Sequence, residues 1–174
     1  LFGRMLEIKN IVNREINGIP KEEYWIQMQV QMETCDLNEC DFLETRFYEY
    51  EDEDAFKDDG TFTTNEDGKL KGMMVCFMID KFPKYEYAPL YLSREENEKW
   101  VETTMNKYND GTWLKNIYWR LEEYSCVLVL RNKNWFDSVV PKIKDLWTII
   151  EKERIDGYDH RKPKKMIRKK EIKE

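Results

Sequence analysis

The sequence predicts an α/β or α+β fold in which a central mixed β-sheet is flanked by helices. Runs with the composition of strands are mixed along the chain with amphipathic helical runs, an order typical of a sheet with helices packed against it. The 174 residues are 41% hydrophobic and 14% aromatic, which excludes a disordered chain although 37% of the residues are charged. This length is sufficient for one domain with its own core.

The N-terminal part predicts a strand, a loop and a helix. Residues 5–9 are rich in apolar residues and predict the strand, and residues 10–19 predict the loop. Residues 21–35 fit two structures, because apolar residues alternate with three glutamines as in a strand. However, the segment follows a proline and opens with Lys-Glu-Glu, and Gln, Met and Glu favour helices. We therefore predict a helix, in which Gln27 and Gln31 share one face.

The middle of the chain predicts three strands joined by polar turns. Aromatic and charged residues interleave over residues 42–50, as in a partly exposed strand. Residues 49–59 carry seven acidic residues against one lysine, and we expect a solvated loop there rather than metal ligands. Asn-Glu-Asp-Gly at 65–68 predicts a hairpin turn. The apolar run 72–79 predicts a buried strand, and residues 85–92, which contain a proline, predict an edge strand.

Helices are expected to cover this sheet. Ser-Arg-Glu-Glu at 93–96 is a capping box, and the helix it opens should run to about Tyr108. After a glycine, residues 113–121 are expected to form a short link and residues 124–131 a strand. Residues 134–155 predict a long amphipathic helix with a proline inside it.

The residue types present exclude several catalytic mechanisms. The one histidine, His160, lies in a basic segment, which removes Ser-His-Asp, Cys-His and H-E-x-x-H mechanisms. No glycine-rich phosphate loop is present, so nucleotide binding is not expected. The four cysteines indicate a reducing, intracellular setting, and a metal site at Cys35 and Cys40 would lack a second ligand pair. Catalysis would therefore depend on carboxylates, lysines and amides, with a hard metal ion.

Glu7-Ile8-Lys9 on the first strand is the candidate for that chemistry. Residues i and i+2 of a strand point to one face, so the Glu7 carboxylate and the Lys9 ammonium would converge. Mg²⁺ prefers oxygen ligands and lowers the pKa of a bound water, while Lys9 could offset charge on a scissile phosphate. This set suits phosphodiester hydrolysis. The tripeptide alone is a weak signal, since it recurs at 171–173 and is commonly just a solvated strand face.

The Glu-Ile-Lys tripeptide at 7–9 is followed, about twenty residues later, by Tyr-Trp-Ile-Gln-Met-Gln-Val-Gln-Met at 24–32. Together these segments resemble the YqaJ-type viral recombinase nucleases, which belong with lambda exonuclease to the PD-(D/E)XK superfamily. In that family an E-x-K strand precedes a helix of the form Y-x-x-Q-x-Q-x-Q-[ML], and all three glutamines match. The resemblance implies a restriction-endonuclease-like fold, with residues 1–157 as the C-terminal portion of a nuclease domain and residues 158–174 as a basic tail.

The resemblance also implies roles for individual residues. The Glu7 side chain and the Ile8 carbonyl would bind Mg²⁺ or Mn²⁺, Lys9 would be the catalytic lysine, and Gln27 would support the site near the metal or the scissile phosphate. Gln29 and Gln31 match the pattern, but we expect them to serve packing or helix polarity. The family has a further metal-binding Asp on the preceding strand, and no residue here matches it. We therefore expect a piece of a longer nuclease, with little or no activity alone.

The function implied by the resemblance is a metal-dependent exonuclease that acts on the ends of double-stranded DNA during viral recombination or replication. It would digest one strand from 5′ to 3′ and pass single strands to an annealing protein, in the host cytoplasm or nucleus. Ring-shaped trimers occur among relatives, which makes a homo-oligomer a further expectation. No apolar run is long enough to cross a bilayer, so no membrane partner is expected.

Two further interpretations stay open at this point. The basic tail could bind DNA phosphates or could simply be a solubilising segment. Its candidate DNA-binding residues are Lys164, Lys165, Arg168 and Lys169. The missing Asp keeps open a non-catalytic DNA- or protein-binding module built on a decayed nuclease fold.

Overall fold

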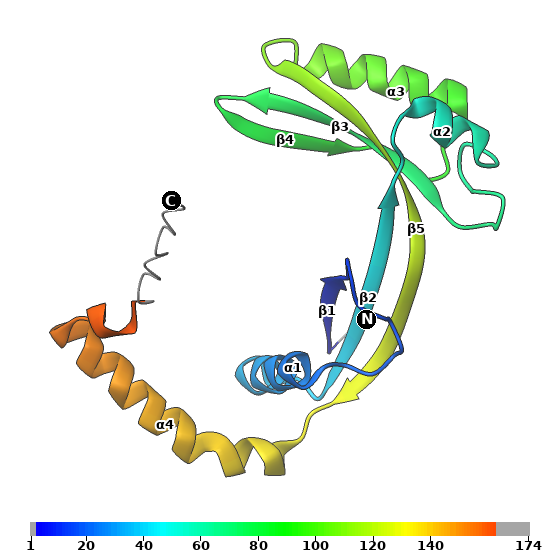
Figure 1. Cartoon of the computed structure of the whole chain (residues 1–174). Helices are drawn as coiled ribbons and strands as arrows, with labels where there is room; N and C mark the ends of the chain where they lie inside the picture. Colours follow the sequence, from blue (N-terminus) through cyan, green and yellow to red (C-terminus); the bar gives the residue numbers. More distant parts are fainter. Residues whose placement is uncertain (1–2, 163–174) are drawn as a thin grey trace, which may run out of the picture. The chain divides into compact units, whose positions relative to one another are not determined.

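The computed structural model describes residues 3–162 (Figure 1) and divides the chain into two compact units, Leu1–Arg131 and Asn132–Glu174. The first unit has the predicted mixed α/β fold, a five-stranded mixed sheet with helices packed against it. The second unit contains one long helix. The four candidate DNA-binding residues of the basic tail lie outside the described residues.

The sheet of the first unit has the strand order β1-β2-β5-β3-β4, and only its first pair is parallel. The strands are β1 (Arg4–Asn10), β2 (Glu39–Glu49), β3 (Lys71–Ile79), β4 (Phe82–Tyr87) and β5 (Thr112–Leu130). A parallel pair needs a long crossover connection, and helix α1 (Glu22–Thr34) lies in the segment that joins β1 to β2. Strand β1 stands first in the strand order, so it is an edge strand within the part of the chain that the structure describes.

Helix α1 covers one face of β1, β2 and β5, as Figure 1 shows. The alternation of apolar residues in this segment had left a strand open, and the structure confirms the helix. Met28 and Met32, one turn apart, are fully buried against Cys40 and Phe42 of β2 and Val129 of β5. A helix buries residues at i and i+4 together, so these two methionines fix which side of α1 faces the sheet.

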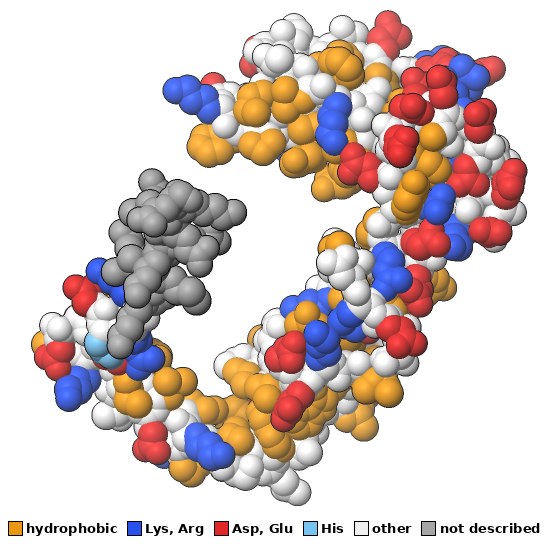
Figure 2. Space-filling view, in the orientation of Figure 1, with side chains coloured by type: hydrophobic (Ala, Val, Ile, Leu, Met, Phe, Trp, Pro, Cys, Tyr) orange, Lys and Arg blue, Asp and Glu red, His pale blue; other side chains and the backbone are white. Residues whose placement is uncertain are grey.

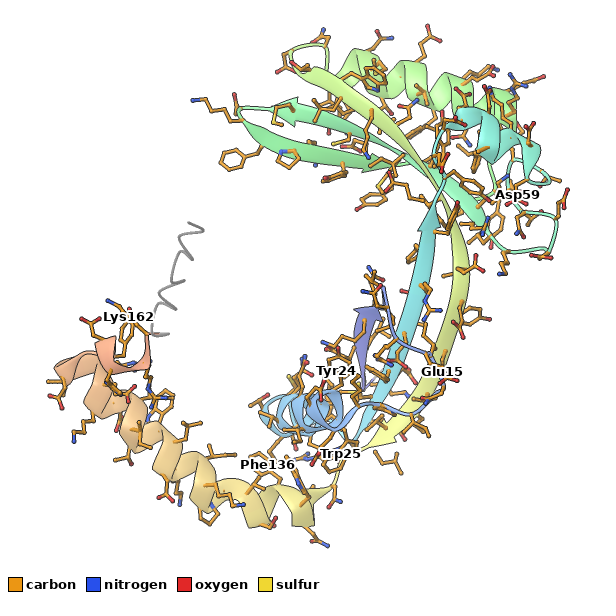
Figure 3. The ribbon with its side chains drawn as sticks, in the orientation of Figure 1. Glu15, Tyr24, Trp25, Asp59, Phe136 and Lys162 are labelled. Atoms are coloured by element: carbon orange, nitrogen blue, oxygen red, sulfur yellow. The ribbon has the colours of Figure 1, made fainter. Side chains whose placement is uncertain are left out.

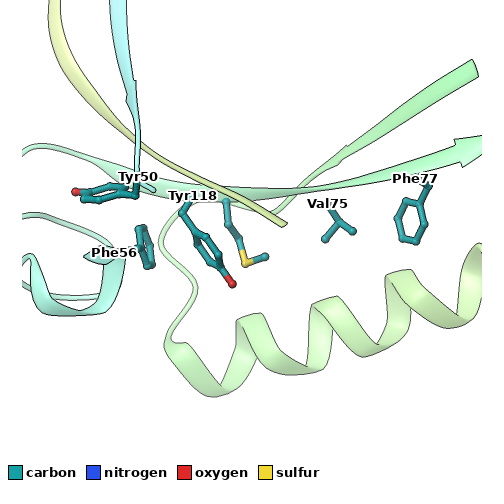
Figure 4. Close-up of a cluster of buried hydrophobic side chains, with 6 residues drawn as sticks. Tyr50, Phe56, Val75, Phe77 and Tyr118 are labelled. Atoms are coloured by element: carbon teal, nitrogen blue, oxygen red, sulfur yellow. The ribbon is translucent and has the colours of Figure 1, made fainter. Parts of the chain in front are cut away.

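A second hydrophobic core forms where β3 and β5 meet α2 (Glu53–Asp58) and α3 (Arg94–Lys107). Figure 4 shows its buried side chains between the sheet and these helices. Phe56 of α2 is fully buried, and its ring meets that of Tyr50 edge-on with centroids 5.4 Å apart. The predicted capping box is present at the start of α3, where Ser93 and Glu96 each bond the other's backbone N–H.

Three predictions about this unit were wrong. Residues 113–121 are not a link but part of the 19-residue strand β5, because β3 pairs with this stretch up to Arg120 and β2 pairs with β5 from Trp119 onward. The acidic run is not only a loop, since the Asp52 side chain caps α2 and Phe56 anchors that helix in the core. The edge strand is β4, which ends before the segment that contains Pro89.

The predicted hairpin turn at residues 65–68 is present. The Asn65 carbonyl accepts the Gly68 N–H, and Thr64 forms a bridge with Leu70. A second turn, at Asp80 and Lys81, joins β3 to β4, and both residues have positive φ (50° and 70°). This backbone geometry is that of a two-residue hairpin turn, which normally carries Asn or Gly, so the turn could not be predicted from Asp-Lys.

The second unit consists of α4 (Lys133–Asp156) followed by a short 3₁₀ helix at Asp159–Arg161. Its start is capped by the Asn132 side chain, which accepts the Trp135 N–H at 2.9 Å. The predicted long helix is thereby confirmed, with Pro141 inside it. Within residues 3–162, no helix combines the length and the apolar character needed to cross a membrane.

Candidate functional site

The structure brings the three predicted catalytic residues into one hydrogen-bonded group. Lys9 Nζ lies 2.6 Å from Glu7 Oε1, as expected for residues i and i+2 of one strand. The Gln27 side chain on α1 contacts both, because its Oε1 accepts from Lys9 Nζ at 3.0 Å and its Nε2 donates to Glu7 Oε1 at 3.0 Å. One amide therefore fixes the positions of the acid and the lysine relative to each other.

The packing of α1 explains why Gln27 reaches the strand. Met28 and Met32 enter the core between α1 and the sheet, and the residue before each of them lies at the border of that buried stripe. Gln27 and Gln31 occupy these border positions, one turn apart, and both point at the carboxylate of Glu7. The core contacts of the helix thus place the amides at the site.

Gln31 is a site residue that the sequence analysis missed. It was expected to serve packing or helix polarity, but its Nε2 donates to Glu7 Oε2 at 3.2 Å. Its spacing of four residues from Gln27 was the signal that could have identified it. Gln29, on the other side of the helix, has the expected packing role, since it is buried and donates to the Leu130 carbonyl at 3.0 Å.

The surroundings of Glu7 favour its charged form. Burial by itself would raise the pKa of this carboxyl group. The hydrogen bonds from Lys9, Gln31 and Gln27, together with the charge of Lys9, outweigh burial and hold the pKa below its ordinary value of 4.5. Glu7 is therefore an anion at neutral pH, which is the state that a metal ligand requires.

The Glu7 carboxylate and the Ile8 carbonyl are two oxygen groups near the free edge of β1 that could hold a metal ion. The Ile11 N–H bonds to the Thr45 carbonyl of β2, and alternation along the strand then turns the Ile8 carbonyl away from β2, toward the free edge. A carboxylate has about four lone-pair sites, and three donors occupy those of Glu7, so one remains. Mg²⁺ often takes only one or two carboxylates and completes its shell with waters and substrate phosphates. Glu7 and Ile8 fit that role.

A second carboxylate ligand was not found beside Glu7. Among residues 3–162 there is no group of three or more His, Cys, Asp or Glu side chains placed to hold a metal ion. Among the described residues, the candidates for metal ligands are therefore the Glu7 carboxylate and the Ile8 carbonyl.

A cationic cluster borders the site. The aromatic ring of Tyr24, on α1, has Lys9 Nζ 4.9 Å and the Arg14 guanidinium carbon 5.5 Å from its centroid. The Arg14 side chain also forms an ion pair with Glu44, which lies opposite Lys9 in the register of β1 and β2. Figure 2 shows lysine and arginine side chains gathered over β1 and the loop that follows it, and Figure 3 places Tyr24 between α1 and these elements.

Comparisons with known proteins give one relative and no family. No protein-family model matches the chain. The chain is 33% identical over 180 residues to an uncharacterised protein of Acanthamoeba polyphaga mimivirus, an alignment that covers 86% of this chain. The chain spans about a third of the length of that relative. The comparison provides a viral relative, and the nuclease family stays a prediction from the sequence motif.

Proposed function

We propose that this chain forms part of a metal-dependent deoxyribonuclease that hydrolyses phosphodiester bonds from the ends of double-stranded DNA. The observation that supports it is the contact of Glu7, Lys9 and Gln27 in one group. The E-x-K and glutamine motifs are about twenty positions apart in the sequence, and the nuclease pattern requires them to meet. A solvated strand face would give no reason for an amide to bridge its acid and its lysine.

Each residue at the site would have a separate role in the reaction. Glu7 and the Ile8 carbonyl would hold Mg²⁺ or Mn²⁺, which when bound lowers the pKa of a water and polarises a phosphate oxygen. Lys9 would orient the attacking water or offset the charge that develops on the phosphate. Gln27 keeps Lys9 and Glu7 in position, and Gln31 holds the second oxygen of Glu7. These contacts already exist without substrate, so little reorganisation would be needed.

The second metal ligand of such a nuclease would come from a strand that pairs with the free edge of β1. That edge carries the Ile8 carbonyl, and a neighbouring strand could present a carboxylate beside Glu7. The mimivirus relative, about three times as long as the matched segment, is viral, and the setting in viral recombination or replication inside the host cell is inferred from the motif resemblance. A single-strand annealing protein and further copies of the chain are the partners that this setting suggests.

A non-catalytic DNA-binding module is the second candidate. It is favoured by one observation, that the described part of the chain has no group of three or more acidic, histidine or cysteine side chains placed to hold a metal ion. The same cationic cluster would serve such a module, since Lys9 and Arg14 can contact phosphates without any hydrolysis. The two candidate functions differ in two outcomes: only the nuclease degrades DNA, and only the nuclease requires a divalent ion.

Digestion of linear duplex DNA in Mg²⁺ or Mn²⁺ tests the proposal. The assay uses this chain and any longer protein of which it is a segment, each as wild type, Glu7→Gln, Lys9→Ala and Lys21→Ala. Loss of a group that stabilises transition-state charge costs on the order of 100-fold or more, so the first two changes should abolish digestion. Lys21 is a matched control, because it is half exposed at the start of α1 and its partner is Glu23.

Two results would contradict the nuclease. Digestion that survives both site substitutions would show that Glu7 and Lys9 do not carry the reaction. Binding of duplex without digestion, by every form of the protein and with every divalent ion, would favour the binding module.

A further inference from the structure

We infer that Arg14 is a second phosphate-binding residue of this site, and that the buried carboxylate of Glu44 positions it. The inference rests on the proposed function, because its ligand is the sugar-phosphate backbone of DNA. Arg14 lies outside both motifs of the family resemblance, in the loop between β1 and α1.

Arg14 and Lys9 form a pair of cations on one aromatic ring. Both lie within about 5.5 Å of the centroid of Tyr24, so the two positive groups border the same ring. Their side chains are about one-fifth exposed, which leaves each accessible to a ligand while its stem is held. Lys9 is paired with Glu7 and Arg14 with Glu44, and each cation keeps N–H donors from which an anion can accept. Backbone phosphates of DNA are anions that come in closely spaced series.

The guanidinium of Arg14 has donors to spare. It has five N–H groups, and its observed partners are the Glu15 carbonyl, at 3.1 Å from Nη1, and the Glu44 carboxylate at Nη2. Its Nε is buried and has no partner among the described residues. A guanidinium with free donors suits a phosphate oxygen, which it can bind through two parallel hydrogen bonds.

Glu44 is placed to orient this guanidinium. It is 1% exposed, it stands directly opposite Lys9 on β2, and it accepts from Arg14 through Oε1 while its Oε2 has no partner in the described chain. A buried carboxylate is costly unless it is paired, so Glu44 and Arg14 depend on each other. Because β2 is an interior strand of the sheet, Glu44 gives Arg14 a fixed support.

The loop that carries Arg14 is also held at its backbone. The Arg46 side chain donates to the Arg14 carbonyl, and Thr45 Oγ1 donates to Asn10 Oδ1 at 2.5 Å. Ile11 and Ile16 of the same loop are buried. The guanidinium is therefore preorganised, which reduces the ordering cost of binding an anion.

Salt-dependent binding of duplex DNA tests the inference. A fluorescently labelled duplex is titrated with the chain in EDTA, so that no digestion occurs, at several salt concentrations. Each phosphate contact contributes about 0.9 to the slope of log K against log salt, so Arg14→Gln should lower that slope by about 0.9. Its affinity should fall by roughly three- to tenfold at moderate salt.

Arg4→Gln is the matched control. Arg4 is also a partly exposed arginine of this segment, and it forms ion pairs with Glu39 and Asp41 of β2. Its neighbour two positions on is Leu6, so alternation places it on the face of β1 opposite to Glu7. The control variant should bind with the wild-type slope.

The positioning role of Glu44 is tested by a double-mutant cycle. Glu44→Gln in the wild-type chain should reduce binding, but it should have no further effect once Arg14 is Gln, because Glu44 acts through Arg14. Effects that add would show a merely structural role. Thermal melting of each variant identifies any loss of fold.

The outcomes separate the two proposals. If the wild-type chain binds no duplex at any salt concentration, the proposed DNA function fails and the inference fails with it. If the wild-type chain binds and Arg14→Gln keeps the same slope, only the inference is overturned. A reduced slope for Arg14→Gln with an unchanged slope for Arg4→Gln supports it.

Discussion

Lys71, the first residue of β3, is a buried lysine whose replacement by methionine tests how the second core is held. Its Nζ donates to the carbonyls of Phe56, Asp59 and Thr61 at 2.5, 2.6 and 2.8 Å, and its side chain is 1% exposed. The last carbonyls of a helix have no partner within the helix, so this ammonium satisfies the end of α2. Methionine has a similar volume and no donor.

The size of the effect follows from these three contacts. A buried acceptor left without a partner costs about 1–3 kcal/mol, and some of the three carbonyls will reach water after a small shift. We therefore expect Lys71→Met to lower the free energy of unfolding by about 3 kcal/mol. In a domain of this size that corresponds to a fall in Tm of roughly 6–12 °C.

Urea denaturation and thermal melting followed by circular dichroism measure this change. Lys115→Met is the matched control, since Lys115 is also a strand lysine but is exposed and forms a surface ion pair with Glu49 at 2.9 Å. Such pairs contribute about 0–1 kcal/mol. Equal stability of the two variants would refute the role assigned to the Lys71 ammonium.

Three more changes have expected outcomes. Burial and the Asp59 carboxylate raise the pKa of Tyr50 to about 12. The stability that the protonated phenol contributes is therefore complete below pH 10, the ordinary pKa of tyrosine, and is lost as the pH rises toward 12. Tyr50→Phe should remove the latest step in a phenolate absorbance titration. The pKa of Glu7 is lowered, so the stability that its carboxylate contributes is complete above pH 4.5 and is lost at lower pH. The difference in unfolding free energy between wild type and Glu7→Gln, measured by urea titration, should therefore be smaller at pH 3 than at pH 7. An equal difference at the two pH values would argue against the Lys9 contact. A Cβ on Gly72 would lie 2.8 Å from Cε2 of Trp119, so Gly72→Ala should lower the urea midpoint by the equivalent of about 1–3 kcal/mol, and an unchanged midpoint would show that the ring moves freely.

The residues at the centre of the site could be predicted only in part, because Glu7, Lys9 and Gln27 came from the motif resemblance while the role of Gln31 was missed. The i and i+2 spacing of Glu7 and Lys9 follows from strand geometry, and the helical spacing of Gln27 and Gln31 follows from helix geometry. What joins the two elements is the parallel pair of β1 and β2 with α1 in the crossover, which the sequence analysis did not predict.

The rest of the site depends on strand register and could not be read from the sequence. Glu44 faces Lys9 because β1 and β2 pair in one particular register, across an intervening loop and helix. Arg14 joins them only because its loop folds back over β2. The link expected at residues 113–121 failed for a related reason, since its pairing partners, β2 and β3, are distant in the sequence. Such non-local pairings leave no local pattern of spacing.

Strand β5 takes part in both hydrophobic cores, because its Val129 belongs to the core under α1 while its Tyr118 belongs to the core at α2 and α3. The two halves of the first unit therefore share their backbone, and neither can open without straining the other. Heating should give a single cooperative transition for this unit. Because Glu39 of β2 pairs with Leu130 of β5, these strands can meet only after nearly the whole unit has been synthesised, so folding should be slow. A nascent chain that stops before Thr112 would expose both sets of apolar side chains at once.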